Sequence, residues 1–400
     1  MKILSLEVKG FRSLYDTTWE PGDLNIVIGP NASGKSNLLR ILEMLSVSAR
    51  GGLAKYIQRE GGMEPILWDG ASDAVQIRLR TSPLGATMAV QRQSLTYQLE
   101  LARLGKTSTY RVGQELLANF YLADRGERDE PFKLLERSAQ RAVVFDEHER
   151  MLAAPEAAVA EEETLLSMAA GPFTANHRIA QYQREMVLWS VYHDLHTNRD
   201  AVIRQPAVAT AEKRVAPDGQ NLVSVLHTLY QGDREFKREV NTAMRAAFGD
   251  EFEELIFPPA ADQRIQFRVR WKSLRREQPA ADLSDGTLRF LFLLAVLANP
   301  DPPPLIAIDE PETGLHPSML PIIAEYSCDA ATRTQVILTT HSPAFLDAFK
   351  DTTPQPTITA VDWLNGKTDL RVRSGEELEH WLKQYTLGEL YRSGELEAME

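Results

Sequence analysis

The sequence contains almost no cysteine and no long uninterrupted hydrophobic run. Cys328 is the one cysteine in 400 residues, which excludes an internal disulfide and a zinc site built on thiolates, and is typical of a reducing compartment. The longest apolar run, Phe290–Ala298, is too short to cross a bilayer. The opening residues Met1–Lys9 alternate like a strand and lack a signal-peptide core. We therefore expect a cytoplasmic protein that does not enter a membrane.

Positive charge is also in short supply. The chain has 44 Lys and Arg against 56 Asp and Glu, and its formal charge of −12 argues against a protein that coats nucleic acid through bulk charge. A local basic patch stays possible. Sustained heptads are missing too, which argues against a long coiled-coil arm. The length suggests two or three lobes with a sizeable core.

One stretch, Gly29–Ser36, matches the phosphate-loop pattern G-x-x-x-x-G-K-[ST] at every fixed position. The apolar run Leu24–Ile28 predicts a buried strand before it, and Asn37–Leu42 opens a helix after it. Glycines let the backbone approach phosphates, and the N–H groups and helix dipole bind them. We expect Lys35 to reach the outer phosphates and Ser36 to hold Mg²⁺. The residues expected to bind the nucleotide here are Gly29, Asn31, Ala32, Ser33, Gly34, Lys35, Ser36 and Asn37.

A second group of residues with anion-binding character lies at 283–287, with the sequence Leu-Ser-Asp-Gly-Thr. It precedes an apolar helix expected over 288–297. The Ser284 hydroxyl, the Gly286 N–H and the helix dipole predict a second anion site at this helix start.

The apolar segment Leu305–Glu310 predicts a buried strand that ends in two carboxylates, the Walker B pattern. We expect Asp309 to hold Mg²⁺ through its water shell, and Glu310 to orient or deprotonate the attacking water. A further strand, Gln335–Thr340, ends at His341, which is expected to sense a γ-phosphate. Strand ends line the ligand crevice of an open α/β sheet, so these side chains belong together.

These motifs, in this order, resemble an ABC-type ATPase head of the RecF/SMC/OLD kind, the "AAA family ATPase" proteins of bacterial DNA repair and antiphage defence. The resemblance also rests on the Lys9–Ser13 turn before the phosphate loop and on the Asp-Glu-Pro-Glu-x-Gly-Leu-His-Pro run at 309–317. It is strong over 1–50 and 280–350. It implies an α/β fold with a phosphate-loop parallel sheet and an antiparallel β-lobe. It also places Arg12 near the nucleotide, where this side chain either contacts phosphate or base or lies in a solvated turn.

The resemblance further implies ATP and Mg²⁺ as cofactors and a head-to-head homodimer or higher homo-oligomer. ATP would lie between Lys35 and Ser36 of one copy and Ser284 and Gly286 of another. Asp309, Glu310 and His341 would complete the site within the first copy, and ATP would be hydrolysed to ADP and phosphate.

We expect three segments. Residues 1–115 form an ATPase lobe with antiparallel strands, because apolar and polar residues alternate at 75–80 and 95–101. Residues 116–250 form a mainly helical insertion, with helical spacing at Phe132–Leu135 and an acidic run, Glu161–Glu163, interpreted as a solvated helix face or mobile segment. Residues 251–400 form the other half of the ATPase lobe.

Two features depart from the family pattern. No residue is convincingly the glutamine-loop residue; the candidates are Gln58, Gln91 and Gln93. The residues that follow His341 are too few for an appended nuclease domain, which takes about 100 residues. Any nuclease is therefore expected to be a separate partner.

Three functions compete. The first is an ATP-driven switch that controls a partner effector in antiphage defence. The second is a RecF-like DNA-repair ATPase, in which a basic strand face contacts DNA; the same face is otherwise a solvated surface or a protected sheet edge. The third, a transporter subunit, is disfavoured by Asp285 and by the Lys9–Ser13 turn. The basic strand face consists of Arg264, Arg268, Arg270 and Lys272.

Overall fold

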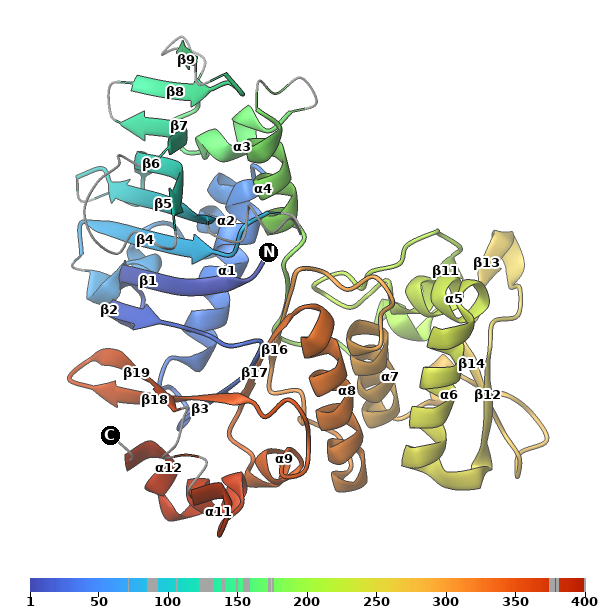
Figure 1. Ribbon diagram of the computed structural model, residues 1–400. Coiled ribbons are helices and arrows are strands. Elements are labelled where there is room, and N and C mark those ends of the chain that lie inside the picture. Colours follow the sequence, from blue (N-terminus) through green and yellow to red (C-terminus); the bar gives the residue numbers. More distant parts are fainter. Residues whose placement is uncertain are drawn as a thin grey trace. The chain divides into compact units, whose positions relative to one another are not determined.

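The structure is a computed structural model whose chain divides into two compact units, each described by itself (Figure 1). Unit 1 comprises residues 1–22, 29–189 and 359–372, and unit 2 comprises 23–28, 190–358 and 373–400. The structure describes residues 1–70, 72–84, 93–105, 107–121, 132–138, 141–148, 150–153, 159–171, 174, 176–373, 378 and 381–398.

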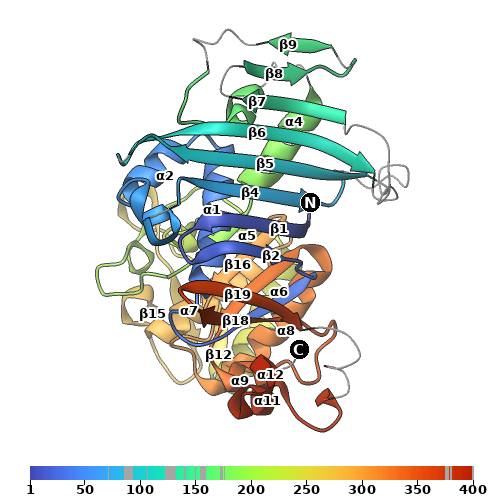
Figure 2. The same cartoon turned by 90° about the vertical axis from the view of Figure 1, so that its left-hand side faces the viewer.

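An antiparallel sheet of eight strands dominates unit 1 (Figure 2). Its strands, in spatial order, are β2 (Leu14–Trp19), β1 (Ile3–Phe11), β4 (Ala74–Thr81), β5 (Gln93–Arg103), β6 (Tyr110–Tyr121), β7 (Phe132–Ser138), β8 (Arg141–Phe145) and β9 (Met151–Ala153). Val75, Ile77 and Leu79 of β4 are buried while the residues between them are more exposed. This alternation confirms the expected antiparallel β-lobe.

Four helices accompany this sheet: α1 (Lys35–Ala49), α2 (Leu53–Arg59), α3 (Leu165–Ala169) and α4 (His177–Val187). α1 contacts the other three, and α3 and α4 also contact β7. The buried face of α1 carries Leu38, Leu42 and Leu45, at the spacing of an amphipathic helix. Two neighbouring strands, β18 (Thr357–Leu364) and β19 (Lys367–Arg373), supply the remaining part of unit 1.

Unit 2 is built on parallel strands in the order β10 (Ser190–Tyr192), β16 (Leu305–Asp309), β17 (Gln335–Thr340) and β3 (Leu24–Ile28). All residues of β17 and β3 are buried, as expected of strands covered on both faces. In the register, Asp309 lies opposite Thr339, and Thr340 lies opposite Ile28. The carboxyl ends of these strands therefore meet at one edge of the sheet.

The remaining elements of unit 2 are helices and short strands. The helices are α5 (Leu222–Gly232), α6 (Arg234–Phe248), α7 (Asp285–Leu297), α8 (Leu320–Arg333), α9 (Pro343–Asp347), α11 (Leu387–Ser393) and α12 (Glu395–Ala398). The strands are β11 (Ala207–Val208), which pairs with β13 (Arg264–Ile265), and β12 (Phe252–Ile256), β14 (Arg268–Trp271) and β15 (Gln278–Pro279), which form a small sheet. Within the described residues, no helix combines the length and the apolar composition needed to span a membrane.

Three expectations about local structure are wrong. Phe132–Leu135 lies in strand β7, because cross-strand pairing with β6 and β8 decides the structure of a short apolar run that fits helix and strand alike. Of the two alternatives for Glu161–Glu163, the helix face is wrong, because these residues lie outside any helix, while the mobile segment stays untested. The Glu163 carboxylate accepts hydrogen bonds from the N–H groups of Leu53 and Ala54 at the start of α2. The expected single strand over 264–272 is divided between β13 and β14, which belong to different sheets. The three-segment division stays a prediction.

Candidate active site

The phosphate-loop sequence forms a tight turn in unit 1, between the end of β3 and the start of α1. Gly29, Ala32 and Gly34 have positive φ angles of 146°, 67° and 110°. Lys35 is buried, and its Nζ donates hydrogen bonds to the carbonyl oxygens of Gly29 at 2.7 Å and Pro30 at 3.0 Å. Curling of the backbone around a lysine ammonium is the arrangement that a phosphate-binding loop requires.

Two features of the loop fit a bound phosphate group. The hydroxyl of Ser33 is buried and has no hydrogen-bond partner. Asn31, Ala32 and Ser36 are exposed, so a ligand can reach the outer side of the turn. A buried polar atom without a partner costs free energy, which a ligand oxygen would recover.

The loop is anchored by side chains that sequence reasoning missed. The Thr368 hydroxyl on β19 donates to the carbonyl oxygen of Ser33 at 2.8 Å and also bonds to the Ser13 hydroxyl at 2.6 Å. Asn37 Nδ2 donates to the same Ser13 hydroxyl at 2.8 Å. No sequence signal points to Thr368, because it lies more than three hundred residues away from the loop.

Arg12, expected near the nucleotide, is engaged by a carboxylate of unit 1. Its guanidinium forms an ion pair with Glu60, whose Oε2 also accepts a hydrogen bond from Arg40 at 3.1 Å. Arg12 Nε is buried without a hydrogen-bond partner, and the residue has a φ angle of 48°. Arg59 Nε also lies 3.5 Å from Glu60 Oε1, so three guanidinium groups share one carboxylate. Whether Arg12 contacts a nucleotide stays a prediction.

In unit 2, the two carboxylates of the Walker B segment lie at the end of β16. The Thr339 hydroxyl on β17 donates a hydrogen bond to Asp309 and accepts one from the N–H of Glu310 at 3.1 Å. Pairing of β16 with β17 produces this contact, because Asp309 and Thr339 are opposite each other in the register. Asp309 is therefore held in place by the neighbouring strand.

His341 and Glu310 come together as the sequence predicted. His341 Nδ1 lies 2.8 Å from Glu310 Oε1, within hydrogen-bond distance. Glu310 has a φ angle of 46°, which is rare for a residue other than glycine. Strained backbone of this kind persists when the surrounding structure fixes it, and it is concentrated at functional sites. Both side chains are partly exposed, Glu310 at 34% and His341 at 47%.

Glu312, to which the sequence gave no role, joins this group through Thr340. The Thr340 hydroxyl donates to Glu312 Oε1 and accepts a hydrogen bond from the N–H of Ser342 at 2.9 Å. These bonds fix the backbone on both sides of His341. Burial raises the pKa of Glu312, and Oε2 of this side chain has no hydrogen-bond partner.

A histidine, His193, follows the end of β10. No residue was a convincing candidate for the expected glutamine loop. Tyr192 pairs with Ile308, so His193 follows at the level of Asp309. His193 Nδ1 lies 3.7 Å from Asp309 Oδ2. Of the glutamines considered, Gln58 is exposed on α2, Gln91 lies outside the described residues, and of Gln93 only the backbone, at the start of β5, is described.

The segment predicted to form a second anion site lies at the start of α7, and its anion binding stays a prediction. Ser284 is the N-cap of α7, and its hydroxyl accepts a hydrogen bond from the N–H of Thr287 at 3.1 Å. A Cβ at Gly286 would lie 2.7 Å from the carbonyl oxygen of Gly314, so only glycine allows the two segments to approach so closely. The start of α7 thus packs directly on the loop that follows Glu310.

Arg204 holds this segment and was also missed by sequence reasoning. It is almost fully buried, and its guanidinium donates to the carbonyl oxygens of Leu283 at 2.7 Å and Ala280 at 3.0 Å. It also forms an ion pair with Asp285. A lone arginine in an irregular region carries no sequence signal for such a role.

Two of the four cations on the basic strand face considered for nucleic acid are offset by carboxylates. Arg270 forms ion pairs with Glu254 and Glu277, each at 2.8 Å. Arg268 lies 3.7 Å from the same Glu277. These two arginines lie on β14, whereas Arg264 lies on β13 and Lys272 follows β14. The four side chains therefore do not form one continuous strand face.

Comparison with known proteins gives the family. Residues 24–347 match the family model described as "AAA domain, putative AbiEii toxin, Type IV TA system". The chain belongs to this family. The match runs from the first residue of β3 to the end of α9, and so includes every element of the candidate site except β1, β2 and β19. A search of curated proteins found no match.

Solved structures with this fold include two heads of SMC proteins. One is an SmcHead bound to the C-winged helix domain of ScpA, with a TM-score of 0.56 and 14% identity, covering 95% of this chain and 100% of that chain. The other, derived from Pyrococcus furiosus, is an Smc head with an extended coiled coil bound to the C-terminal domain of ScpA, with a TM-score of 0.54 and 12% identity, covering 96% and 99%. The expected RecF/SMC-type ABC ATPase head fold is confirmed. This AAA-domain protein is an ATPase of that general type.

Replacement of Gly34 by alanine should abolish nucleotide binding. Its Cβ would lie 2.1 Å from the Thr368 hydroxyl and 2.7 Å from the Ser13 hydroxyl, and the residue has a φ angle of 110°. We expect the affinity for a fluorescent ATP analogue, measured by anisotropy, to fall about 100-fold or more, which corresponds to about 2.7 kcal/mol. Gly232→Ala is the matched control, because nothing lies within 4 Å of its Cβ position. Unchanged binding by Gly34→Ala would contradict the assignment of the loop.

Proposed function

We propose that this protein is a Mg²⁺-dependent, cytoplasmic ATPase that dimerises head-to-head on ATP. It acts as a switch that controls a separate effector protein, in bacterial antiphage defence. The proposal rests on the motif order, on the family and fold, and on the geometry within each unit.

One observation carries the proposal, the position of β3 in the sheet of unit 2. Ile28, the last residue of β3, pairs with Thr340, and Gly29 of the phosphate loop is covalently next. The same edge holds Asp309 and Glu310 after β16, and His341 after β17. Within unit 2, the carboxylates and the histidine therefore lie at the edge where β3 ends. That the phosphate loop serves the same nucleotide is what the family resemblance implies.

The residues present fit Mg·ATP. Lys35 and the loop N–H groups would bind the β- and γ-phosphates, with Gly29, Asn31, Ala32, Ser33, Gly34 and Asn37 forming the cradle. Ser36 and Asp309 would hold the metal, Asp309 through water. Mg²⁺ would neutralise charge that develops on the phosphate oxygens. It keeps much of its water shell, so two protein side chains suffice.

Hydrolysis needs a water molecule placed in line with the γ-phosphate. Glu310 would orient this water and accept its proton while the water oxygen bonds to phosphorus and the bond to the ADP oxygen breaks. His341 would hold Glu310 through the 2.8 Å contact and respond to the presence of the γ-phosphate. The products are ADP and phosphate.

His193 would take the place of the missing glutamine. It lies at the end of a strand parallel to β16 and close to the Asp309 carboxylate. An imidazole can donate or accept a hydrogen bond there, so it can orient a metal-bound water as a glutamine amide would.

Dimerisation follows from the second anion site. The hydroxyl of Ser284 and the N–H of Gly286 would bind the γ-phosphate held by another copy, as the resemblance implies. ATP would then join two copies, and hydrolysis would release them. The control of a separate effector is supported by analogy, since the SmcHead of the same fold was crystallised with a domain of ScpA, another protein.

The alternative, a RecF-like DNA-repair ATPase, has weaker support. It relied on a basic strand face, and two of the four cations on that face are offset by Glu254 and Glu277. DNA-stimulated ATPase activity with salt-sensitive binding would favour it. ATPase activity indifferent to DNA, with a co-purifying second protein, favours the defence switch.

Glu310→Gln should leave ATP binding intact and stop turnover. The amide cannot accept the proton of the attacking water, and loss of a general base costs about 10²–10⁴ in rate. We expect phosphate release to fall at least about 100-fold while light scattering shows an ATP-dependent dimer that persists. Hydrolysis at the wild-type rate would show that Glu310 is not the base.

Ser284→Arg should prevent ATP-driven association while each copy still binds ATP. The long cationic side chain would block the approach of a second copy, and the control Ser284→Thr keeps both the hydroxyl and the helix cap. Analytical ultracentrifugation with ATP in the Glu310→Gln background measures the outcome. Association that survives the arginine substitution would refute the role in trans.

Glu312→Ala should slow hydrolysis without weakening ATP binding, because Thr340 loses its acceptor and the backbone around His341 loosens. We expect kcat to fall about tenfold or more, since small misplacements of reacting groups are costly. Glu312→Gln should retain most activity, as it keeps an acceptor oxygen and resembles the neutral carboxyl favoured by burial. Equal kcat values for the alanine variant and the wild type would show that this contact does not position His341.

A further inference from the structure

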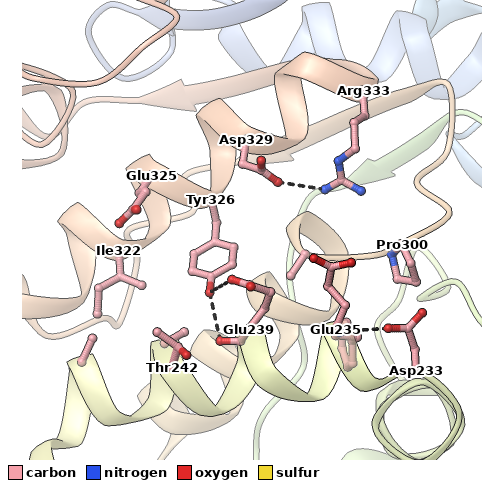
Figure 3. A pocket seen from close by; sticks show the side chains of 14 residues that line it. Asp233, Glu235, Glu239, Thr242, Pro300, Ile322, Glu325, Tyr326, Asp329 and Arg333 are labelled. Carbon is pink, nitrogen blue, oxygen red and sulfur yellow. Dashed lines mark hydrogen bonds and ion pairs between the residues drawn. The ribbon is translucent and has the colours of Figure 1, made fainter.

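A groove lies between α6 and α8 of unit 2, and none of the residues that line it is assigned to nucleotide chemistry (Figure 3). Its volume is about 570 Å³. α6 and α8 form its two walls, and the turn at 298–300 closes one end. A space of this size accommodates several side chains of a binding partner.

The floor of the groove is apolar. Phe236, Ala243 and Ala246 contribute from α6, and Ile322 contributes from α8. Phe236 and Ala243 are buried, whereas Ala246 is exposed to the groove. Small residues on α6 keep the helix surface flat, so a side chain from a partner can pack against it.

The walls of the groove are acidic. Asp233, which caps α6, and Glu235 and Glu239 of α6 line one side, and Glu325 and Asp329 of α8 line the other (Figure 3). The single cation among the lining residues, Arg333, is itself offset. It donates to the carbonyl oxygens of Asn299 at 2.6 Å and Leu297 at 3.2 Å and pairs with Asp329 at 3.2 Å. Arg238 also pairs with Glu235 at 3.0 Å and with Glu239 at 2.9 Å. The five carboxylates still outnumber these two arginines, so the groove keeps a net negative charge over an apolar floor.

We propose that this groove is the docking site of the partner effector, and that it recognises a basic amphipathic helix of that protein. Such a helix presents an apolar stripe flanked by Lys and Arg, which complements an apolar floor between two acidic walls. The chemistry disfavours a nucleic acid, whose phosphates the net negative charge of the groove would repel. The proposal rests on the proposed function for the existence of a partner.

The position of α8 explains how such a partner would influence ATP hydrolysis. α8 begins at Leu320, after the loop that follows Glu310, and ends at Arg333, just before β17 leads to His341. One wall of the groove is therefore the connection between the end of β16, next to Glu310, and the start of β17, the strand that ends at His341. A ligand that shifts α8 acts on both, and the coupling is measurable as a change in ATPase rate.

The test uses the full-length protein and a synthetic peptide of roughly 18 residues, with leucine at i, i+3, i+4 and i+7 positions and lysine elsewhere. A scrambled peptide of the same composition controls for bulk charge. The double variant Glu235→Lys/Glu325→Lys replaces one carboxylate on each wall by a cation. Ala246→Trp fills the groove without a change of charge. Asp250→Lys/Asp351→Lys, at two exposed positions outside the groove, is the matched control.

We expect the amphipathic peptide to bind the wild type and the control variant alike, and both groove variants at least about tenfold more weakly, by fluorescence anisotropy. It should also change the ATPase rate of the wild type and of the control variant only. Circular dichroism melts verify that each variant is folded.

The proposal is overturned by any of four results: no binding to the wild type, equal binding of the scrambled peptide, full affinity of the groove variants, or complete displacement by spermine at equal concentration. Absence of ATPase activity in the wild type, together with groove-dependent binding, would refute the proposed function and leave the docking site standing.

Discussion

The parallel pairing of β3 with β17 and of β17 with β16 is the constraint on which the site depends. Each strand end carries one functional segment: Gly29 after β3, His341 after β17, and Asp309 with Glu310 at β16. A shift of one residue between β16 and β17 would move the Thr339 hydroxyl away from Asp309, and a shift between β17 and β3 would move Ile28 away from Thr340. Fully buried, β-branched strands specify that register because their side chains fill the space between covering layers.

Hydrogen bonds then fix the side chains that we propose to be catalytic. Thr339 holds Asp309 and the Glu310 backbone, while Thr340 joins Glu312 to the segment after His341. Two adjacent threonines on one strand thus serve the two sides of the site. The unusual φ angle of Glu310 is tolerated because these contacts fix its neighbours.

The sequence predicts the parts of this site that are local and cannot predict those that are assembled by tertiary structure. Gly29–Ser36 and Leu305–Glu310 are contiguous, so strand, turn and chemistry appear together in the residues themselves. Thr368 and Arg204 reach their partners across large sequence separations, and nothing local distinguishes them. The helix prediction for Phe132–Leu135 was wrong for the same reason, since only pairing with β6 and β8 decides between helix and strand in this segment. His193 was detectable in principle, as a polar residue directly after a short apolar run. The family pattern, however, has a glutamine at this place and so does not predict a histidine.

The contact between Gly286 and Gly314 connects the two halves of the proposed cycle inside one unit. The N-terminus of α7, which would meet the γ-phosphate of another copy, packs on the loop that begins at Glu310 and continues to α8. Because no side chain separates the two backbones, a displacement of one is transmitted to the other with little loss. Closure on a second copy would therefore bear on the catalytic carboxylate and on the start of α8 simultaneously. An ATP-dependent contact at Ser284 would act on the loop after Glu310, and a partner in the α6–α8 groove would act on α8, which follows that loop. Each ligand would then alter the affinity of the protein for the other by the same factor.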